Sequence, residues 1–210
     1  MGGSVSIHLP HFGHLTFEEQ ADLLMPDYAL KREFDFQPGD WTIADESWRK
    51  IASDHDIMNR FYEAFFRISA SQDTTLVDIH GTGLKTKIQF VINVFAEALI
   101  MTKEMDETLI KSTVQKYVHH YLYDMGLRVH HFRNVGFIMI RTFEECENPH
   151  WNEESRIVWH KLVSLILWYL IVAGLQQEHS LSHDELAAIE SKFHGETVTS
   201  VSITSTSASE

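Results

Sequence analysis

The stretch N152-E-E-S-R-I-V-W-H-K-L-V-S-L-I-L-W-Y-L-I-V-A-G-L175 decides the fold class of this sequence. It opens with an asparagine and two glutamates, which are typical of a helix N-terminus. Its apolar part, residues 162–175, is interrupted by Ser164 and Gly174 and is shorter than the roughly 18 residues that indicate a membrane span. A helix that is apolar almost all round is normally buried by other elements. We therefore expect a core helix at about 152–175.

The sequence on the N-terminal side of this stretch repeats apolar residues at helical spacing. From residue 41 onward they recur three and four positions apart, and proline and glycine are scarce. No segment alternates at a period of two, so no strand is expected and the fold class is predicted to be all-α. The spacing predicts further helices at about 42–53, 55–69, 84–103, 106–124 and 128–146.

Residues 1–40 differ from the helical domain, which we expect to span residues 41–176. They hold three of the four prolines and several loose polar stretches, so they are predicted to form an N-terminal extension. Within it, Thr16 and Glu19 form a capping box, in which each side chain satisfies the other residue's backbone amide. This pattern predicts one short helix at about 16–24.

The C-terminal end of the chain is predicted to hold one more helix and a tail. Ser182 and Glu185 form a second capping box, and Gly195 can end the helix that the box begins. We therefore expect an extra helix within residues 177–196. Residues 197–210 are rich in serine and threonine and carry too few apolar groups to order themselves. They are predicted to be a disordered tail.

The charge of the chain excludes several function classes. Among 210 residues, 30 are acidic and 17 are basic, which gives a formal net charge of -13. Such a field repels phosphate backbones, and no cluster of lysine and arginine offsets it, so nucleic-acid binding is not expected. The sequence also lacks a Gly-rich phosphate loop and a G-x-S-x-G nucleophile motif. Nothing in it resembles hydrolase machinery.

Cysteine and histidine usage limits the metal sites that the chain can form. Cys146 is the only cysteine, so an internal disulfide and multi-cysteine zinc or iron–sulfur sites are impossible, and a cytoplasmic location is expected. The 14 histidines include the doublets His119–His120 and His130–His131. Adjacent residues do not share a helix face as residues four apart do, so a zinc site would need tertiary contacts.

Five segments between residues 43 and 175 resemble the globin family in their order and spacing. The motif E46-S-W-R-K-I51 resembles the globin A helix with its buried tryptophan, here Trp48. F61-Y-E-A-F-F66 is similar to the B helix, and L84-K-T-K-I88 to the start of the E helix. V118-H-H-Y-L-Y-D-M-G-L-R-V-H-H-F132 with V135-G136 resembles the end of the F helix running into the G helix, and R156-I-V-W-H-K-L-V163 the H helix. The resemblance implies a globin-like fold with a short preceding helix and an extra C-terminal helix.

The resemblance also implies a haem b cofactor held by one histidine. Globins place this proximal histidine near the end of the F helix, shortly before a glycine, and both His119 and His120 precede Gly126. If residues 109–125 form one helix, His120 lies about 110° from the centre of the apolar stripe and His119 about 150°. His120 is therefore the expected axial ligand of the iron, with His119 as the alternative.

Further pocket residues follow from the same resemblance. It places Tyr62 on the distal side of the haem, where its hydroxyl could donate a hydrogen bond to a bound diatomic ligand. It gives Leu84 the usual distal position, sets Lys87 near a haem propionate and puts Ile88 in the pocket wall. The remaining haem contacts that it assigns are Tyr117, Val129 and Phe132.

The function that the resemblance implies is coordination of O2, NO or CO at a His-ligated haem iron, or one-electron chemistry there, with gas sensing as one role. The alternative is a haem-free globin-fold module that serves as a sensory or protein-interaction scaffold, alone or as a homodimer. Enzymatic activity is not expected. A haem-dependent NO dioxygenase or peroxidase-like activity would need a reductase, and the chain has no flavin or nicotinamide motif.

The first six residues, M1-G-G-S-V-S6, fit the pattern for N-myristoylation with Gly2 as the acceptor. Because glycine and serine are abundant, chance matches to this pattern are common, and such a start also occurs as a cloning remnant. A single myristoyl chain binds membranes only marginally, and no basic patch supports it here. We expect, at most, weak and reversible membrane attachment through this segment.

Overall fold

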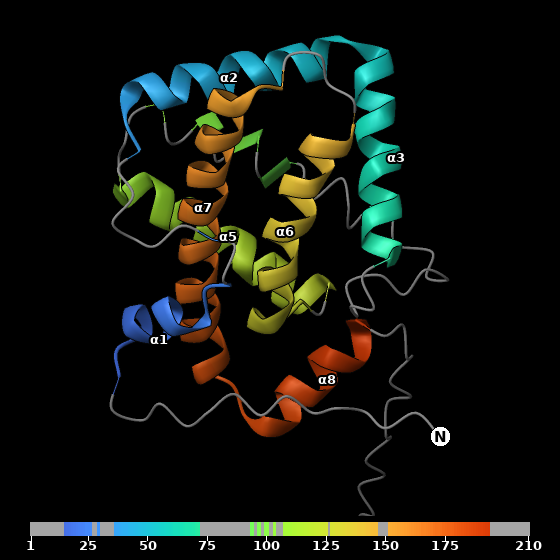
Figure 1. Ribbon diagram of the computed structural model, residues 1–210. Helices are drawn as coiled ribbons and strands as arrows, with labels where there is room; N and C mark the ends of the chain where they lie inside the picture. Colours follow the sequence, from blue (N-terminus) through green and yellow to red (C-terminus); the bar gives the residue numbers. More distant parts are fainter. Residues whose placement is uncertain are drawn as a thin grey trace, which may run out of the picture.

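The computed structural model contains seven helices and no strand within the residues that it describes (Figure 1). Over that part of the chain, the all-α prediction is confirmed. The described residues are 15–26, 29, 36–71, 93–94, 96–97, 99–100, 103, 107–125, 127–146 and 151–193.

The helices follow the sequence in simple order. They are α1 Phe17–Leu24, α2 Pro38–Ser53, α3 His55–Ser71, α5 Glu107–Met125, α6 Val129–Glu145, α7 Glu153–His179 and α8 His183–Phe193. The described residues between 93 and 100 are also helical, within the helix predicted at 84–103. The bounds of α1, α3, α5 and α6 lie within two residues of those predicted from the sequence.

Two helix ends differ from the prediction for identifiable reasons. Helix α2 begins at Pro38, four residues before the predicted start, because proline suits the first helical position and the Gln37 amide donates to the Asp40 Oδ2 at 2.9 Å. Helix α7 continues for one turn past residue 175, to His179. The sequence prediction ended α7 with the apolar run, yet the glutamines that follow are good helix formers.

Both predicted capping boxes are confirmed. At the start of α1, the Thr16 amide donates to the Glu19 Oε2 at 2.7 Å, and the Glu19 amide donates to the Thr16 Oγ1 at 3.2 Å. At the start of α8, the Ser182 amide donates to the Glu185 Oε2 at 2.8 Å, and the Glu185 amide donates to the Ser182 Oγ at 3.3 Å. These reciprocal bonds satisfy amides that the first helical turn leaves without partners.

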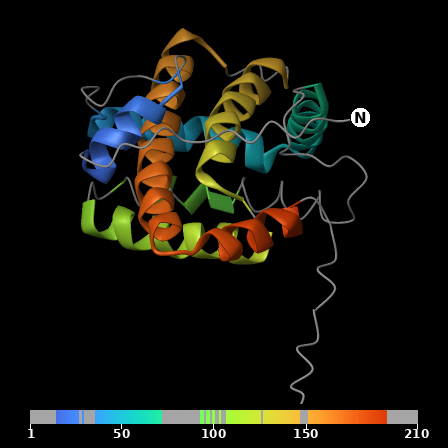
Figure 2. The same cartoon turned by 90° about the horizontal axis from the view of Figure 1, so that it is seen from below.

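Helix α7 is the centre of the structure. Helices α1, α2, α5 and α6 all pack on it, while α3 packs on α6 and α8 on α5. Figure 1 shows α6 and α7 side by side with α2 across their upper ends, and Figure 2 shows α8 lying along α5. By length and composition α7 could cross a membrane, but 78% of its most apolar 18-residue window is buried inside the structure. It is therefore the core helix that its composition predicts.

An aromatic cluster joins α2, α3, α6 and α7 at one end of the bundle. The ring centroids of Phe143 and Trp159 are 4.2 Å apart, and those of Phe61 and Phe143 are 5.2 Å apart. Trp48 lies edge-on to Phe61 and Phe143 and is tilted relative to the ring of Trp159. Trp159 is fully buried, whereas Trp48, which the globin resemblance assigns as the buried tryptophan, is only half-buried. Such clusters dominate core energetics because each ring buries a large apolar area.

Helix α1 is anchored to the C-terminal half of α7 by a hydrogen bond and a ring contact. The Trp168 Nε1 donates a hydrogen bond to the Asp22 Oδ1 at 2.8 Å, and the rings of Phe17 and His179 meet edge to face at 5.6 Å. Ala21 faces α7 and is fully buried. The short helix of the N-terminal region therefore contributes to the main core.

Candidate functional site

Helix α5 carries the candidate proximal histidines and has two distinct faces. One face is apolar and packs toward α7. Its buried residues recur every four positions: Ile110, Val114, Val118 and Leu122. The other face is polar and aromatic, and three of its side chains are half-buried: Thr113, Tyr117 and His120. These three share one side of the helix, since they are spaced four and three residues apart. The second face is thus half-buried, and Tyr117 on it packs against the edge of the apolar core.

The two candidate ligands differ in exposure. His120 is half-buried on the second face of α5, whereas His119 is exposed. The His119 ring packs against the ring of Tyr123, with centroids 4.5 Å apart. An axial ligand must reach a cofactor that is shielded from water, so the sheltered imidazole is the better placed of the two. Of the two histidines, His120 is the more sheltered.

Tyr117 connects the second face of α5 to the chain that precedes it. Burial of the phenol raises the Tyr117 pKa above its usual value of 10.0, and a hydrogen bond to the Glu97 carboxylate and the charge of Glu97 raise it further. Glu97 belongs to the helical residues between 93 and 100. The face that holds His120 is therefore turned toward this segment. The globin resemblance assigns Tyr117 to a haem contact, whereas in the structure its hydroxyl is hydrogen-bonded to the Glu97 carboxylate.

The predicted distal residues are only partly within the described chain. Tyr62 lies on α3, half-buried against the core, with its ring 6.5 Å from the ring of Phe61. Leu84, Lys87 and Ile88 lie outside the described residues, as does the acylation candidate Gly2. The structure therefore places the candidate distal tyrosine and leaves the expected pocket wall as a prediction.

Val129 and Phe132, assigned to haem contacts by the resemblance, are buried in the first turns of α6 and lie against Gly174 of α7. A Cβ atom at Gly174 would lie 2.7 Å from the Val129 Cγ2 and 3.1 Å from the Phe132 Cε2. Glycine is therefore required for the close approach of α6 to α7. Sequence reasoning noted Gly174 only as a break in an apolar run and missed this role.

A buried carboxylate at the corner between α5 and α6 was also missed. Glu178, in the last turn of α7, accepts a hydrogen bond from the Val129 amide at 2.7 Å and from the Arg128 Nη2 at 3.0 Å. Only 8% of Glu178 is exposed. The sequence gives no sign of the pairing between Arg128 and Glu178, because the two residues are 50 positions apart and neither belongs to a local motif.

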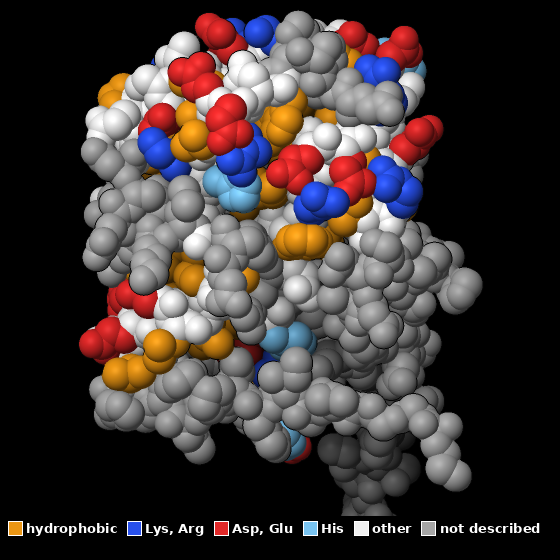
Figure 3. Space-filling model, in the orientation of Figure 1, with side chains coloured by type: hydrophobic (Ala, Val, Ile, Leu, Met, Phe, Trp, Pro, Cys, Tyr) orange, Lys and Arg blue, Asp and Glu red, His pale blue; other side chains and the backbone are white. Residues whose placement is uncertain are grey.

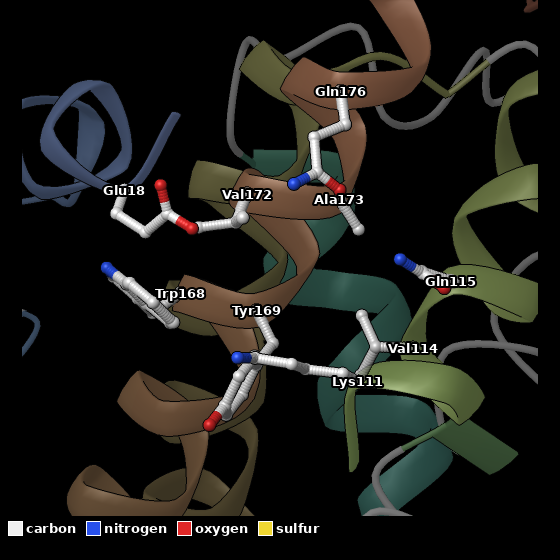
Figure 4. A pocket seen from close by; sticks show the side chains of 9 residues that line it. All are labelled: Glu18, Lys111, Val114, Gln115, Trp168, Tyr169, Val172, Ala173 and Gln176. Atoms are coloured by element: carbon white, nitrogen blue, oxygen red, sulfur yellow. The ribbon is translucent and has the colours of Figure 1, made fainter. Parts of the chain in front are cut away.

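A small cleft lies between α1, α5 and α7 (Figure 4). Its volume is about 110 Å³. Its lining consists of Glu18, Lys111, Val114, Gln115, Trp168, Tyr169, Val172, Ala173 and Gln176. Pockets that enclose cofactors or drug-sized ligands measure roughly 300–1,000 Å³. The cleft is too small for such a ligand and includes neither His120 nor Tyr62.

The face of the molecule seen in Figure 3 carries interspersed acidic and basic side chains. Arg67 on α3 and Arg141 on α6 both pair with Glu145, at 2.8 and 2.7 Å. Exposed pairs of this kind contribute little to stability, with a median of about 0–1 kcal/mol. We interpret the part of this surface where these charges alternate, in the upper half of Figure 3, as solvated.

Metal coordination by several protein side chains is not found in the described chain, where no group of three or more His, Cys, Asp or Glu residues comes together. A haem iron needs only one or two protein ligands, so this result does not bear on haem.

No family model, no curated protein and no solved structure matches this chain. Of the predicted site residues in the described chain, His120 and Tyr117 share the second face of α5. Val129 and Phe132 lie together against Gly174 at the start of α6.

Proposed function

We propose that this protein binds haem in the manner of a globin, with His120 as the axial ligand of the iron and a diatomic gas as the ligand on the opposite side. The observation that carries the proposal is the half-buried position of His120 on a face of α5 separate from the one that packs on α7.

The donor chemistry of this face suits haem. A neutral imidazole is the usual proximal ligand in haem proteins, and His120 is sheltered while its neighbour His119 is exposed. His120 would hold the iron and Tyr117 would lie beside it, with Leu84, Lys87 and Ile88 expected on the facing wall. When bound, haem supplies an iron that can coordinate O2, NO or CO or exchange one electron.

The helix arrangement also supports the globin interpretation. The segments that resemble the A, B, F, G and H helices of globins fall on α2, α3, α5, α6 and α7, in that order. These helices pack pairwise around a shared core, as the helices of globins do. Within this arrangement, Tyr62 of α3 is the candidate donor of a hydrogen bond to the gas.

A sensory role is favoured over gas storage by the position of α8. This helix follows the globin-like segments and packs on α5, the helix that carries His120. A displacement of His120 on gas binding could therefore reach α8 through direct contact. Catalytic use of the haem, as an NO dioxygenase or peroxidase, would need electrons from a separate protein.

The second candidate function is a haem-free scaffold that binds a protein partner. This function is favoured because three of the residues assigned to contact haem already contact other protein residues. Val129 and Phe132 pack against Gly174, and the Tyr117 hydroxyl is hydrogen-bonded to the Glu97 carboxylate. In this case the half-buried face of α5 would be a structural contact alone.

A haem titration followed by absorption spectroscopy tests the proposal and separates the two candidates. We expect a sharp Soret band that saturates at one haem per chain in the wild type and in His119→Ala. His120→Ala should bind haem much more weakly and lose the spectrum of a histidine-ligated iron. Because the two variants replace adjacent histidines with the same residue, each is the control for the other. Absence of a saturable Soret band in the wild type would exclude the haem function.

A further inference from the structure

The carboxylate of Glu178 holds the corner at which α5 ends and α6 begins. Its Oε1 accepts a hydrogen bond from the Val129 amide at 2.7 Å, and its Oε2 accepts from the Nη2 and Nε atoms of Arg128, the nearer at 3.0 Å. The exposed fractions of the two side chains are 9% for Glu178 and 19% for Arg128. This is an ion pair largely removed from water, with both carboxylate oxygens engaged.

The chain offers no local substitute for this carboxylate. The residue before α6 is Arg128, which has no side-chain oxygen with which to accept a bond from the first amides of the helix. Glu178 accepts from the first of them instead, and its negative charge is favourable beside the positive end of the helix dipole. Removal of the carboxylate would take this partner from the Arg128 guanidinium and the Val129 amide, and removing one partner of a buried ion pair is strongly destabilising.

The corner that Glu178 holds lies directly after the candidate iron ligand. His120 is within the last two turns of α5, which ends at Met125, and α6 begins at Val129. One turn before Glu178, Gly174 allows Val129 to lie against α7. The end of α7 therefore fixes the start of α6 through a buried ion pair and a close helix contact. Only three residues connect Met125 at the end of α5 to Val129 at the start of α6, so fixing the start of α6 limits where the last turn of α5 can lie.

We propose that Glu178 is the positioning residue for His120: by fixing the corner after α5, it sets the orientation that the imidazole presents to the iron. The proposal rests on the haem function proposed above. Glu178 itself does not touch the cofactor. Residues that orient an iron ligand from behind commonly change metal affinity about 10–100-fold when they are replaced.

The test compares Glu178→Ala and Glu178→Gln with Ser47→Ala. The last variant removes a buried hydrogen bond in the aromatic cluster, far along α7 from the corner. The readouts are haem affinity and the iron–histidine stretching band in the resonance Raman spectrum of the ferrous, gas-free protein. We expect Glu178→Ala to shift and broaden the band and to weaken haem binding about 10–100-fold. Glu178→Gln keeps an oxygen for the Val129 amide and should give a smaller change.

Ser47→Ala should leave the band unchanged although it lowers stability. If it moved the band as Glu178→Ala does, the effect would be general destabilisation and the positioning role would be wrong. An unmoved band in Glu178→Ala would overturn the role as well.

If the wild type does not bind haem, the proposed function is wrong, but the role of Glu178 is still undecided. Amide hydrogen exchange of the haem-free protein then decides it. Faster exchange in Glu178→Ala at residues 120–125 as well as at residue 129 supports control of the end of α5 by this carboxylate. Faster exchange at residue 129 alone contradicts it. If the alanine variant does not fold, the same comparison is made with Glu178→Gln.

Discussion

The indole Nε1 of Trp159 donates a hydrogen bond to the Ser47 Oγ at 2.7 Å in the interior of the protein, where the two side chains are 0% and 4% exposed. Ser47 in turn donates its hydroxyl proton to the Ala44 carbonyl at 2.9 Å. This chain of bonds satisfies the one polar group of Trp159, the largest fully buried side chain among the residues that the structure describes. It also ties α2 to α7, two helices far apart in the sequence.

Ser47→Ala should lower the free energy of unfolding by about 1–3 kcal/mol, since it leaves a buried indole N–H without an acceptor. Urea denaturation followed by circular dichroism measures the loss. Ser112→Ala is the matched control, because Ser112 is exposed on α5 and donates only to the Leu109 carbonyl within its own helix. The control should change stability by less than about 0.5 kcal/mol. Equal losses in both variants would contradict a special role for the Trp159–Ser47 bond.

Gly174→Ala should also destabilise the protein, although alanine is the better helix former. The gain in helix propensity is about 1 kcal/mol, whereas overpacking against the stiff Val129 side chain and the buried Phe132 ring costs about 1–3 kcal/mol. We expect a net loss of up to about 2 kcal/mol in urea denaturation. The paired substitution Gly174→Ala with Val129→Ala should lose less than the sum of the two single changes.

Gly39→Ala provides the contrast, because a Cβ at Gly39 would meet nothing within 4 Å. It should leave stability unchanged or raise it by up to about 1 kcal/mol. A stabilising Gly174→Ala would show that α6 and α7 do not approach as closely as described.

Local patterns predicted the helices well, and tertiary contacts account for what they missed. The capping boxes at Thr16 and Ser182 and the apolar spacing of α5 and α6 are properties of neighbouring residues, so the sequence alone was sufficient. Gly174 and Glu178 act on residues that are distant along the chain, and their types carry no signal of that. An apolar run likewise does not reveal where a helix ends, which is why α7 was predicted too short.

The candidate site was predictable only in part. Helical periodicity distinguished His120 from its neighbour on the same helix, because it compares directions within one element. It could not indicate that the Tyr117 hydroxyl would meet Glu97, or that Val129 and Phe132 would lie against α7, since each contact depends on how two helices cross.

Asp22→Ala should loosen α1 from α7, because it removes the acceptor of the Trp168 indole N–H. Amide hydrogen exchange of residues 17–24 should become faster, and the rest of the protein should keep its protection. Loss of one hydrogen bond to a charged acceptor corresponds to about 1.5–3 kcal/mol in the local opening free energy. Leu23→Ala is the control, since the Leu23 side chain is 61% exposed and its removal should leave α1 docked. Unchanged exchange in Asp22→Ala would contradict the anchoring role of this bond.

The environment of Tyr117 makes stability depend on pH in the alkaline range. Burial and Glu97 raise its pKa in the folded protein above the usual 10.0, so the folded chain keeps a proton that the unfolded chain releases. The stabilisation is therefore complete below about pH 10 and is lost as the pH rises toward the folded-state pKa.

Two variants test this dependence. Tyr117→Phe should lose less stability than the wild type above about pH 10. Glu97→Gln should lower the Tyr117 pKa while leaving it raised by burial. Spectrophotometric titration of tyrosinate, taken as the difference between wild type and Tyr117→Phe, measures this pKa directly. A tyrosinate signal with an ordinary pKa in that difference would contradict the described contact with Glu97.

The central claim, that His120 holds a haem iron, is tested most directly by the absorption spectrum of ferrous, haem-loaded His120→Gly with and without added imidazole. Glycine removes the ligand and leaves space in which free imidazole can replace it. We predict that the variant loses the wild-type spectrum, that imidazole restores it, and that His119→Gly needs no rescue. A wild-type spectrum in His120→Gly without imidazole would show that another residue ligates the iron and would contradict the account.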